Sequence, residues 1–317
     1  MRVTTGKSAI VYAMEAIKQK IPEMAYKLDE PLRNHTTIKI GGCVYAMLFP
    51  GSIGILTEIC SILSEYEITP FIMGNGSNIL ANDKRFDLIV IKTSNIKSIS
   101  LIAAKVPAKQ EYTDVTVEAG ALLSDTAVFA YKNGLSGFEF AHGIPGTAGG
   151  AIVMNAGAYG REMKDVVQST TVFNEAAGIL ELTAEDNELS YRQSRFSKTN
   201  EIVLSSVIRL EKENKEKIKQ KIDDFDSRRK KSQPLDFPSC GSTFKRPENG
   251  YAAALIEQAG LKGYTIGGAQ VSDKHAGFII NRKDASFDDV IKLIEYVQGV
   301  VLKRTGIQLE PEIRILH

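Results

Sequence analysis

Apolar residues recur at helical spacing near the start of the chain and give way to strand-like patterns further along. Within the first 25 residues Ile10, Met14, Ile17 and Ile21 fall on one helical face, and residues 51–67 show the same spacing. Short apolar or alternating runs predict strands at TPFIMG, FDLIVIKTS and VTVEAG. The sequence SDTAVFAYKNG, which follows the last of these runs, predicts a helix with a polar N-cap and a glycine at its end.

The second half of the chain contains β-rich sequence, a charged segment and a mixed C-terminal region. Strands are predicted at VVQSTTVFN, GILELTA and EIVLSSVIRL, and the almost wholly charged residues 211–231 predict a solvated helix that links two domains. The remainder predicts helices at YAAALIEQAG and SFDDVIKLIEYVQGVVLKRTG, strands near YTIGGAQVS and HAGFIIN, and a final strand IQLEPEIRIL. Because strands and helices do not alternate strictly, the pattern favours α+β domains over one doubly wound parallel sheet.

Composition and charge exclude several classes of protein. At 317 residues, with 43% hydrophobic and 24% charged residues, the chain is typical of a soluble protein with two or three domains. A net charge of +1 gives no bulk attraction to nucleic acid or to an anionic membrane, so a bound anion needs a local site. No apolar run approaches the roughly 18 residues of a membrane span, and the N-terminus lacks the apolar centre of a signal peptide.

Cysteine and histidine usage points to a reducing compartment and away from metal binding. Cys43, Cys60 and Cys240 are odd in number and show no CxxC spacing, which favours reduced thiols and a cytoplasmic protein. The four histidines form no HExxH motif or cluster, so no metal site is expected.

Two glycine-rich segments raise the question of what approaches the backbone so closely. Residues 142–160 read HGIPGTAGGAIVMNAGAYG, more than half of them Gly or Ala, and residues 74–78 read GNGSN. Consecutive backbone N–H groups with little side-chain bulk form anion-binding concavities, which would suit a diphosphate. Neither segment is a Walker A loop or a GxGxxG fingerprint. The residues alone therefore indicate a large dinucleotide-like ligand, with tight turns and a close helix–sheet contact as the alternative.

A second motif, SCGSTFKRP at 239–247, combines a loop hydroxyl with two cations. Ser242 follows Gly241, where the backbone can turn sharply, and Lys245 and Arg246 suit an acidic substrate. Because no GxSxG elbow is present, Ser242 is a better proton donor or hydrogen-bond donor than hydrolytic nucleophile. The alternative is a simple turn that Ser242 caps. Cys240 is the one cysteine of interest, since it lies beside this serine.

Two further stretches carry charged residues that could act in a site. LEPEIRIL sets Glu310 and Glu312 on one face of the predicted final strand, where the alternative is a solvated carboxylate or one paired with Arg314. SYRQSRF at 190–196 carries Arg192 and Arg195 just before a predicted strand. Surface loops often contain such arginines, so this stretch alone indicates little.

Five motifs resemble, in the same order along the chain, those of the UDP-N-acetylenolpyruvoylglucosamine reductase family. They are GNGSN, LSGFEFAHGIPGTAGGAIVMNAGAYG, SYRQSRF, SCGSTFKRP and LEPEIR. These flavoenzymes make UDP-N-acetylmuramate for bacterial peptidoglycan, and so serve cell wall biogenesis, cell shape and cell division. The resemblance runs from about NHTTIKIGG (34–42) to the C-terminus. It implies an α+β flavoenzyme of three domains with a vanillyl-alcohol-oxidase (PCMH) type FAD-binding fold. The implied boundaries are 1–84 and 85–211 for the two FAD-binding subdomains and 212–317 for the substrate-binding domain.

The resemblance also implies roles for individual residues. Arg192, Ser242 and Glu312 match the family's catalytic arginine, proton donor and catalytic glutamate. The uridine diphosphate is less clearly assigned, and Gln233, Lys245 and Arg246 are candidates by charge and loop position. The FAD diphosphate would rest on backbone N–H groups of the glycine-rich segments. The implied cofactor-binding residues are Gly74, Asn75, Gly76, Ser77, Asn78, Gly120, Gly143, Ile144, Pro145, Gly146, Thr147, Gly149, Gly150, Asn155, Ala156 and Gly157.

The implied reaction suits these residue types. NADPH gives hydride to the flavin, and the reduced flavin gives hydride to the methylene carbon of the substrate's enolpyruvyl ether. Arg192 would stabilise the enolate-like charge that develops on the substrate. Glu312 would have to be protonated, with its pKa raised by burial. Ser242 would deliver a proton to the adjacent carbon through a relay that the sequence does not identify.

Some features depart from the family pattern. Cys43 and Val44 stand where the family commonly has a Pro–Ala pair, and no insertion between 161 and 211 can hold the tyrosine loop of one branch. The chain therefore resembles the shorter, type II branch, and a monomer or weak dimer that acts on a UDP-sugar is expected. The alternatives are an alcohol or sugar oxidase on the same FAD fold and a non-catalytic nucleotide-sugar binding protein.

Overall fold

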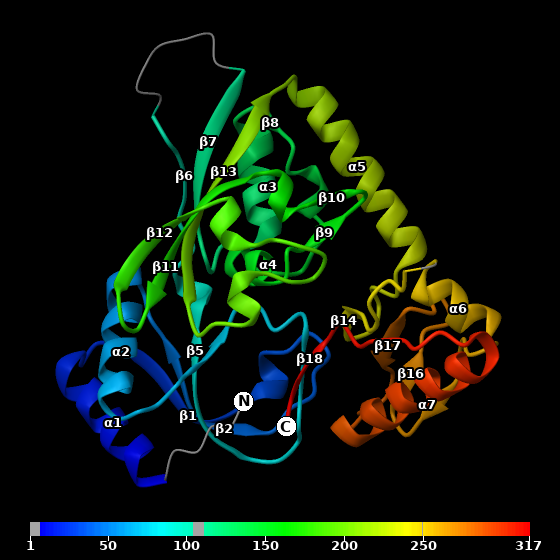
Figure 1. Ribbon diagram of the computed structural model, residues 1–317, viewed down its shortest axis with the longest axis horizontal. Helices are drawn as coiled ribbons and strands as arrows, with labels where there is room; N and C mark the ends of the chain where they lie inside the picture. Colours follow the sequence, from blue (N-terminus) through cyan, green and yellow to red (C-terminus); the bar gives the residue numbers. More distant parts are fainter. Residues whose placement is uncertain (1–6, 104–110, 249) are drawn as a thin grey trace. The chain divides into compact units, whose positions relative to one another are not determined.

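The computed structural model describes residues 7–103, 111–248 and 250–317, so the first six residues of the predicted N-terminal helix lie outside the described part. The chain forms two compact units, each built from segments distant in the sequence (Figure 1). Unit 1 comprises residues up to 28, 45–75 and 87–227, and unit 2 comprises residues 29–44, 76–86 and 228–317. The finer division at 84/85 and 211/212 stays a prediction.

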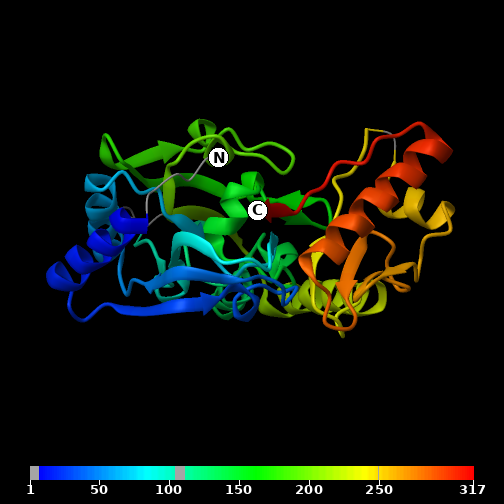
Figure 2. The same cartoon turned by 90° about the horizontal axis from the view of Figure 1, so that it is seen from below.

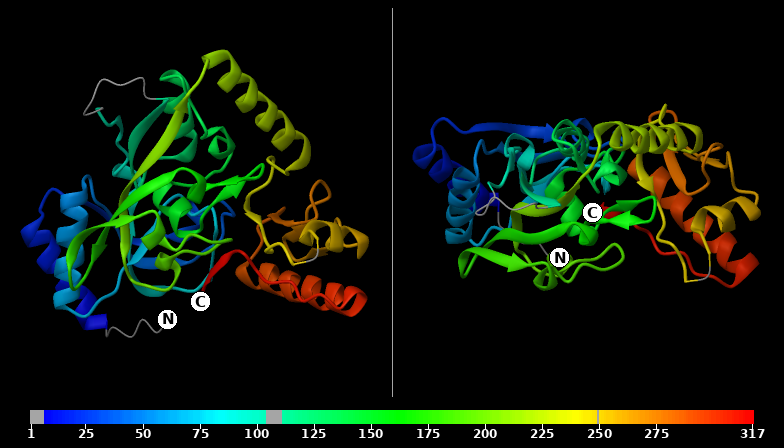
Figure 3. Two further views of the ribbon diagram at one scale, coloured as in Figure 1. Left: turned by 45° about the horizontal axis from the view of Figure 1, so that its top comes forward. Right: turned by 90° about the horizontal axis from the view of Figure 1, so that it is seen from above.

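Two helices and a four-stranded sheet are built by the first 92 residues. The helices are α1 (Lys7–Lys20) and α2 (Ile53–Glu65), which lie side by side in Figure 3 and contact each other. The sheet has the order β1-β2-β5-β3, with β1 (Ala25–Pro31), β2 (Cys43–Phe49), β5 (Phe86–Lys92) and β3 (Phe71–Met73). The isoleucines that predicted both helices lie in one buried cluster with residues of β2 and β5. Both helix predictions are confirmed.

Unit 1 also contains a six-stranded antiparallel sheet that carries the small-residue segment on one face. Its order is β12-β11-β13-β7-β6, and β8 pairs with β13. The strands are β12 (Gly178–Thr183), β11 (Val167–Asn174), β13 (Ile202–Lys212), β7 (Tyr112–Glu118), β6 (Ile99–Leu101) and β8 (Leu135–Ser136). Helices α3 (Leu123–Lys132) and α4 (Ala148–Val153) share one buried cluster with this sheet. The predicted polar cap of α3 is wrong, because Leu122 occupies the N-cap position without a side-chain hydrogen bond.

Unit 2 has a smaller antiparallel sheet covered by helices. The sheet order is β14-β17-β16-β15, with β14 (Ser239–Ser242), β17 (Phe278–Asn281), β16 (Ala269–Val271) and β15 (Thr265–Ile266). Helices α6 (Ala252–Gln258) and α7 (Phe287–Thr305) bury their apolar faces in the same cluster as β16 and β17, and α7 lies along β16 (Figure 2). Ser286 begins α7 with a capping box, and Gly306 ends it in the left-handed conformation.

The C-terminal strand is shorter than the sequence predicts. Only β18 (Arg314–Leu316) forms, and it pairs in parallel with β4 (Ile79–Ala81). Glu310 and Glu312 precede it in irregular backbone around Pro311, so they do not share a strand face. Glu310 forms an ion pair with Lys245.

Most of the charged residues 211–231 form a helix, as predicted, although the first two end β13. α5 (Lys215–Ser232) buries only Ile218 and Ile222 and exposes most of its charged side chains to solvent. The chain passes from unit 1 to unit 2 within this helix, after Ser227.

The remaining elements are short. A hairpin joins β9 (Gly157–Ala158) to β10 (Arg161–Glu162). Single 3-10 turns lie at Leu32–Asn34, Thr93–Asn95, Glu139–Ala141, Met163–Asp165, Glu185–Asn187 and Arg195–Ser197. In the described ranges, no helix is both long enough and apolar enough to cross a membrane.

Candidate active site

The glycine-rich loop, residues 74–78, follows β3 and begins against the small-residue segment within unit 1. Lys92 Nζ donates to the Gly74 carbonyl at 3.0 Å, and Asn75 Nδ2 donates to the Pro145 carbonyl at 2.8 Å. A Cβ on Gly74 would lie 2.2 Å from Thr147 Oγ1, so no larger residue fits there without displacing the threonine. The first two residues of the loop are therefore packed directly on the segment 142–160.

At several positions glycine is required because other atoms of the protein lie where a Cβ would be. A Cβ on Gly120 would lie 1.8 Å from the Thr93 carbonyl oxygen, and one on Gly149 would lie 2.9 Å from the Ala119 Cβ. Gly157 is confined in the same way by the backbone of β10. At these positions the alternative given by the sequence, a close contact within the protein, accounts for the glycine.

Other members of the segment leave polar groups without protein partners. Among the described residues, the backbone N–H groups of Gly143, Gly146, Thr147 and Gly150 donate to no protein acceptor. Thr147 Oγ1 is buried and also has no hydrogen-bond partner. A Cβ on Gly150 would meet only Thr147 Oγ1, at an ordinary 3.5 Å. Buried polar groups are normally satisfied, so this surface fits an oxygen-rich ligand such as a dinucleotide phosphate.

The rest of the glycine-rich loop belongs to unit 2 and also offers N–H groups. In the part of the chain that the structure describes, the backbone N–H groups of Gly76, Ser77 and Asn78 make no hydrogen bond to the protein. Gly76 has a φ of 65°, a left-handed conformation that favours glycine. These residues have the form expected of a phosphate-binding turn.

Arg192 and Arg195 have different environments, although they are three residues apart. Arg195 forms two hydrogen bonds of 2.7 Å to Glu201, whose carboxylate is only 4% exposed. These bonds lower the pKa of Glu201 and raise that of Arg195, so this pair is structural. The guanidinium of Arg192 contacts the carbonyls of Asn155 and Gly157 at 3.4 Å and lies 5.1 Å from the centroid of the Tyr191 ring. It lies beside the small-residue segment of unit 1.

The side chain of Asn155 joins the small-residue segment to the loop that carries Arg192. Asn155 is fully buried, and its amide donates at 3.0 Å to the Glu162 carboxylate and to the carbonyl of Ser190, in the loop that carries Arg192. Its Oδ1 accepts from the backbone of Lys164 at 2.9 Å. The side chain is thus committed to the protein and fixes the arginine loop on the predicted cofactor segment.

A β-bulge exposes Ser242 in unit 2. The register of β14 pairs Ser239 with Ile280 and Ser242 with Phe278, so β14 contains one extra residue. Gly241 accommodates the bulge with a φ of 76°, which confirms the predicted sharp turn. Such a bulge redirects the following side chain, and Ser242 is solvent-exposed.

Cys240, in the same strand, points the other way. Its thiol is buried and donates to the Ile79 carbonyl at 3.2 Å. Burial raises the pKa of this thiol to about 12, so it is protonated and unreactive at neutral pH. Proximity to Ser242 gives it no role in the chemistry.

Glu312 lies opposite Thr243, the residue after Ser242, within unit 2. Its N–H donates to the carbonyl of Thr243 at 2.7 Å, and Phe244 and Pro311 form the next backbone bridge. Asn78 Nδ2 donates to the Glu312 carbonyl at 3.2 Å. The structure therefore brings together two predicted catalytic residues and the end of the glycine-rich loop in one unit.

The three predicted substrate-binding residues each contact another side chain of unit 2. Lys245 pairs with Glu310, with Nζ 3.1 Å from the carboxylate. Arg246 lies over the ring of Tyr251 at 4.2 Å, and Gln233 accepts a hydrogen bond from an arginine of α5. Their roles in binding stay predictions.

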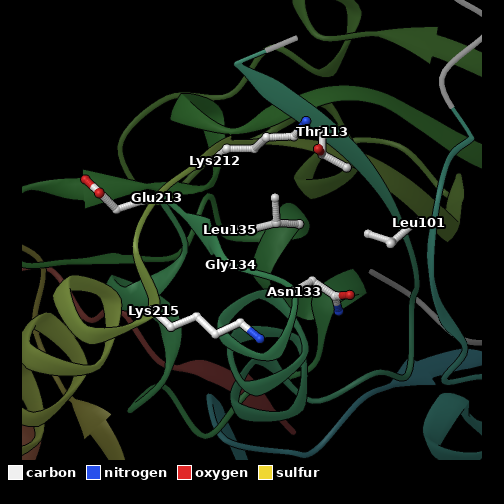
Figure 4. Close-up of a pocket in the computed structure, with 8 residues that line it drawn as sticks. All are labelled: Leu101, Thr113, Asn133, Gly134, Leu135, Lys212, Glu213 and Lys215. Atoms are coloured by element: carbon white, nitrogen blue, oxygen red, sulfur yellow. The ribbon is translucent and has the colours of Figure 1, made fainter. Parts of the chain in front are cut away.

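A surface cavity of about 420 Å³ lies elsewhere in unit 1 (Figure 4). It is formed by β6, β7, the end of α3, β8 and the end of β13. None of its lining residues is a predicted site residue: Leu101, Thr113, Asn133, Gly134, Leu135, Lys212, Glu213 and Lys215. Its size alone does not make it the active site.

Comparison with known proteins gives the family. Residues 45–183 match the FAD binding domain family, and residues 233–316 match the C-terminal domain of UDP-N-acetylenolpyruvoylglucosamine reductase. The UDP-N-acetylenolpyruvoylglucosamine reductase of Caldanaerobacter subterraneus is 48% identical over 303 residues, which cover 96% of this chain and 97% of the relative. The chain belongs to the UDP-N-acetylenolpyruvoylglucosamine reductase family.

Other members of this reductase family agree over nearly the whole chain. The Caldicellulosiruptor bescii reductase is 45% identical over 91% of this chain and 90% of its own length. The crystal structure of the Thermus caldophilus reductase covers 93% of this chain and 99% of that one, with 30% identity and a TM-score of 0.76. The predicted family, the α+β flavoenzyme fold with a separate C-terminal domain and the FAD cofactor are confirmed. The chain is an FAD-dependent oxidoreductase of this reductase family.

Sequence reasoning missed several residues that organise the site. Lys92 ends an otherwise apolar strand and is buried, a placement unusual enough to have been a signal. Thr37 lies in NHTTIKIGG, which marked the start of the resemblance but received no role. The contact of Tyr159 with Phe225, a ring stack at 4.2 Å, joins residues too far apart in sequence to be paired by pattern.

Proposed function

We propose that the chain reduces UDP-N-acetyl-3-O-(1-carboxyvinyl)-glucosamine to UDP-N-acetylmuramate with NADPH, in peptidoglycan precursor synthesis. The observation that carries the proposal is the backbone hydrogen bond of Glu312 to Thr243, the residue after Ser242, next to the loop residue Asn78. The names of the relatives support the same substrate. Three free cysteines are typical of a reducing compartment, which supports a cytoplasmic location.

The residues around the two glycine-rich segments suit the FAD of this family. Within unit 1, the N–H groups of Gly143, Gly146, Thr147 and Gly150 would hold its diphosphate, with the hydroxyl of Thr147 as a further donor. When bound, FAD supplies the carrier that passes hydride from NADPH to the enolpyruvyl group. The protein residues bind and orient both reactants and supply protons.

Ser242 and Glu312 are the proton-supplying groups in this proposal. The bulge at Gly241 exposes the Ser242 hydroxyl, which delivers a proton to the carbon next to the one that receives hydride. Glu312 lies in the adjacent backbone segment and acts as the neighbouring acid. Lys245 and Arg246 follow Ser242 and place positive charge where an acidic substrate binds.

Arg192 stabilises negative charge on the substrate carboxylate as the reaction proceeds. Its guanidinium contacts the carbonyls of Asn155 and Gly157 at 3.4 Å, beside the small-residue segment, whereas Arg195 is paired with the buried carboxylate of Glu201. The proposal requires Arg192 to act on the same substrate as Ser242 and Glu312. Loss of Arg192 should therefore slow substrate reduction more than flavin reduction.

The test separates the two half-reactions by absorbance of the flavin. Anaerobic NADPH should bleach the flavin spectrum, and the enolpyruvyl UDP-sugar should restore it. Ser242→Ala should leave bleaching nearly unchanged and slow restoration by about 10²- to 10⁴-fold, the usual contribution of a positioned acid. Ser100→Ala, at an exposed position in β6, is the control and should match the wild type in both steps.

Two results would contradict the proposal. A flavin that NADPH cannot bleach, but that an alcohol or sugar reduces, would identify an oxidase on the same fold. A protein that binds the UDP-sugar and stays colourless when FAD is supplied would be a binding protein. If Ser242→Ala restores the spectrum at the wild-type rate, Ser242 has no part in proton transfer.

A further inference from the structure

Thr37 connects the glycine-rich loop to the strand that carries Ser242. Within unit 2, its N–H donates to the Gly76 carbonyl at 3.2 Å, and its hydroxyl donates to the Ser239 carbonyl at 2.6 Å. Ser239 is the first residue of β14, three positions before Ser242. One half-buried threonine therefore bonds the predicted phosphate-binding turn and the predicted proton donor's strand at the same time.

Asn78 makes the corresponding connection to Glu312. Its side-chain amide donates to the Glu312 carbonyl at 3.2 Å, and its own carbonyl accepts from Arg314 N–H at 2.9 Å. The chain then continues into β4, which pairs in parallel with β18 from Ile79 onwards. The two bonds of Asn78 hold the backbone on the C-terminal side of Glu312, between its carbonyl and the N–H of Arg314.

We propose that Thr37 and Asn78 are positioning residues that fix Ser242 and Glu312 relative to the glycine-rich loop. The inference rests on the proposed function of the site. Both side chains act on the protein itself in this proposal, because the Thr37 hydroxyl and the Asn78 amide each donate to a backbone carbonyl. The N–H groups of Gly76–Asn78 stay open to the cofactor, so cofactor and proton donors share one rigid frame. Proton delivery depends on such placement, since displacements of about 1 Å can slow a reaction about a hundredfold.

Thr37→Val is the sharpest test, because valine keeps the shape of threonine and removes only the hydroxyl. The backbone bond to Gly76 is retained in this variant. We expect FAD content and bleaching by NADPH to stay at the wild-type level, while restoration by saturating enolpyruvyl UDP-sugar slows by at least about fivefold. Thr37→Ser restores the hydroxyl and should recover most of the rate. Loss of stability alone would not divide the two half-reactions in this way.

Thr36→Val is the matched control in the same loop. The Thr36 hydroxyl donates to the Ile40 carbonyl at 2.9 Å, has no bond to β14 and is more deeply buried. This variant should lose stability without a selective loss of substrate reduction. Asn78→Ala gives an independent reading and should also slow restoration selectively.

The outcomes separate failure of this inference from failure of the proposed function. If Thr37→Val restores the spectrum at the wild-type rate, or if Thr36→Val slows it equally, Thr37 does not position Ser242 and the proposed function stands. If Thr37→Val and Asn78→Ala lose FAD or bleaching in the same proportion as restoration, their role is structural only. If the wild-type flavin is not restored by the UDP-sugar at all, both the function and this inference are wrong.

Discussion

Gly120 and Gly150 are required for opposite reasons, and substitution of each by alanine should have opposite effects on stability. A Cβ on Gly120 would lie 1.8 Å from the Thr93 carbonyl oxygen and 2.6 Å from that of Ile96, both backbone atoms. The Gly120 N–H also donates to Ile96 at 2.7 Å, which keeps the two backbones together. Because neither carbonyl can rotate away, Gly120→Ala should destabilise the protein by about 3 kcal/mol, the upper range for overpacking.

Gly150 has no such neighbour in the protein. A Cβ there would meet only Thr147 Oγ1 at 3.5 Å, and the residue lies exposed in the first turn of α4. Since alanine favours helix over glycine, Gly150→Ala should raise the free energy of unfolding of the FAD-free protein by up to about 1 kcal/mol. The added methyl group covers an N–H that the protein leaves open, so FAD should bind at least about tenfold more weakly, equivalent to about 1.4 kcal/mol of overpacking.

Urea unfolding of the FAD-free proteins and fluorescence titration with FAD would measure both effects. We expect Gly120→Ala to lose stability, and Gly150→Ala to lose affinity for FAD without losing stability. A Gly150→Ala protein that binds FAD as tightly as the wild type would refute the claim that this glycine makes room for the cofactor. A Gly120→Ala protein of wild-type stability would show that the close approach to Thr93 relaxes freely.

Three further experiments test the environments of an arginine, a histidine and two cysteines. Arg195→Ala should destabilise the protein by about 1–3 kcal/mol in denaturant unfolding, because the buried carboxylate of Glu201 loses its cationic partner and keeps only the hydrogen bonds from Asn174 and Thr199. Burial lowers the pKa of His275 below its usual value of 6.5. The stability that the neutral ring contributes is therefore present above pH 6.5 and is lost as the pH falls through the folded-state pKa. In a plot of melting temperature against pH, His275→Gln should lose less stability than the wild type on the acid side. A thiol reagent at pH 8 should modify the half-buried Cys43 first and reach Cys240, whose pKa burial raises to about 12, only when the protein unfolds.

Periodicity predicted the long helices because each has one buried face. In α2 and α7 the isoleucines, leucines and valines that recur at helical spacing are the residues that the core buries. The same reasoning failed at the C-terminus, where IQLEPEIRIL looks like one strand. There Pro311 cannot donate to a ladder, and the backbone of Glu312 bonds to Thr243 and Asn78 instead of to one neighbouring strand. Such long-range partners leave no periodic signal.

The glycine-rich segments show where composition stops being informative. Gly149 and Gly150 are adjacent and identical in sequence, yet one contacts Ala119 and the other faces open space beside Thr147. Sequence could predict that something approaches this backbone, but the identity of the neighbour depends on which strand lies opposite. Only the folded chain separates glycines required by packing from those that leave room for a ligand.

Backbone strain is the third feature that sequence does not reveal, and three of the residues with left-handed backbone lie beside the predicted site. Asn155, Tyr159 and Arg192 all have left-handed φ values, between 40° and 55°, which is unfavourable by about 1 kcal/mol or more for bulky residues. Tyr159 is held there by its stack on Phe225 of α5 and by a bond of its hydroxyl to the Phe225 carbonyl at 2.9 Å. Asn155 is held by its three side-chain bonds, one of which fixes the loop of Arg192. Because glycine adopts this conformation without strain, the arginine at this position is unfavourable for stability.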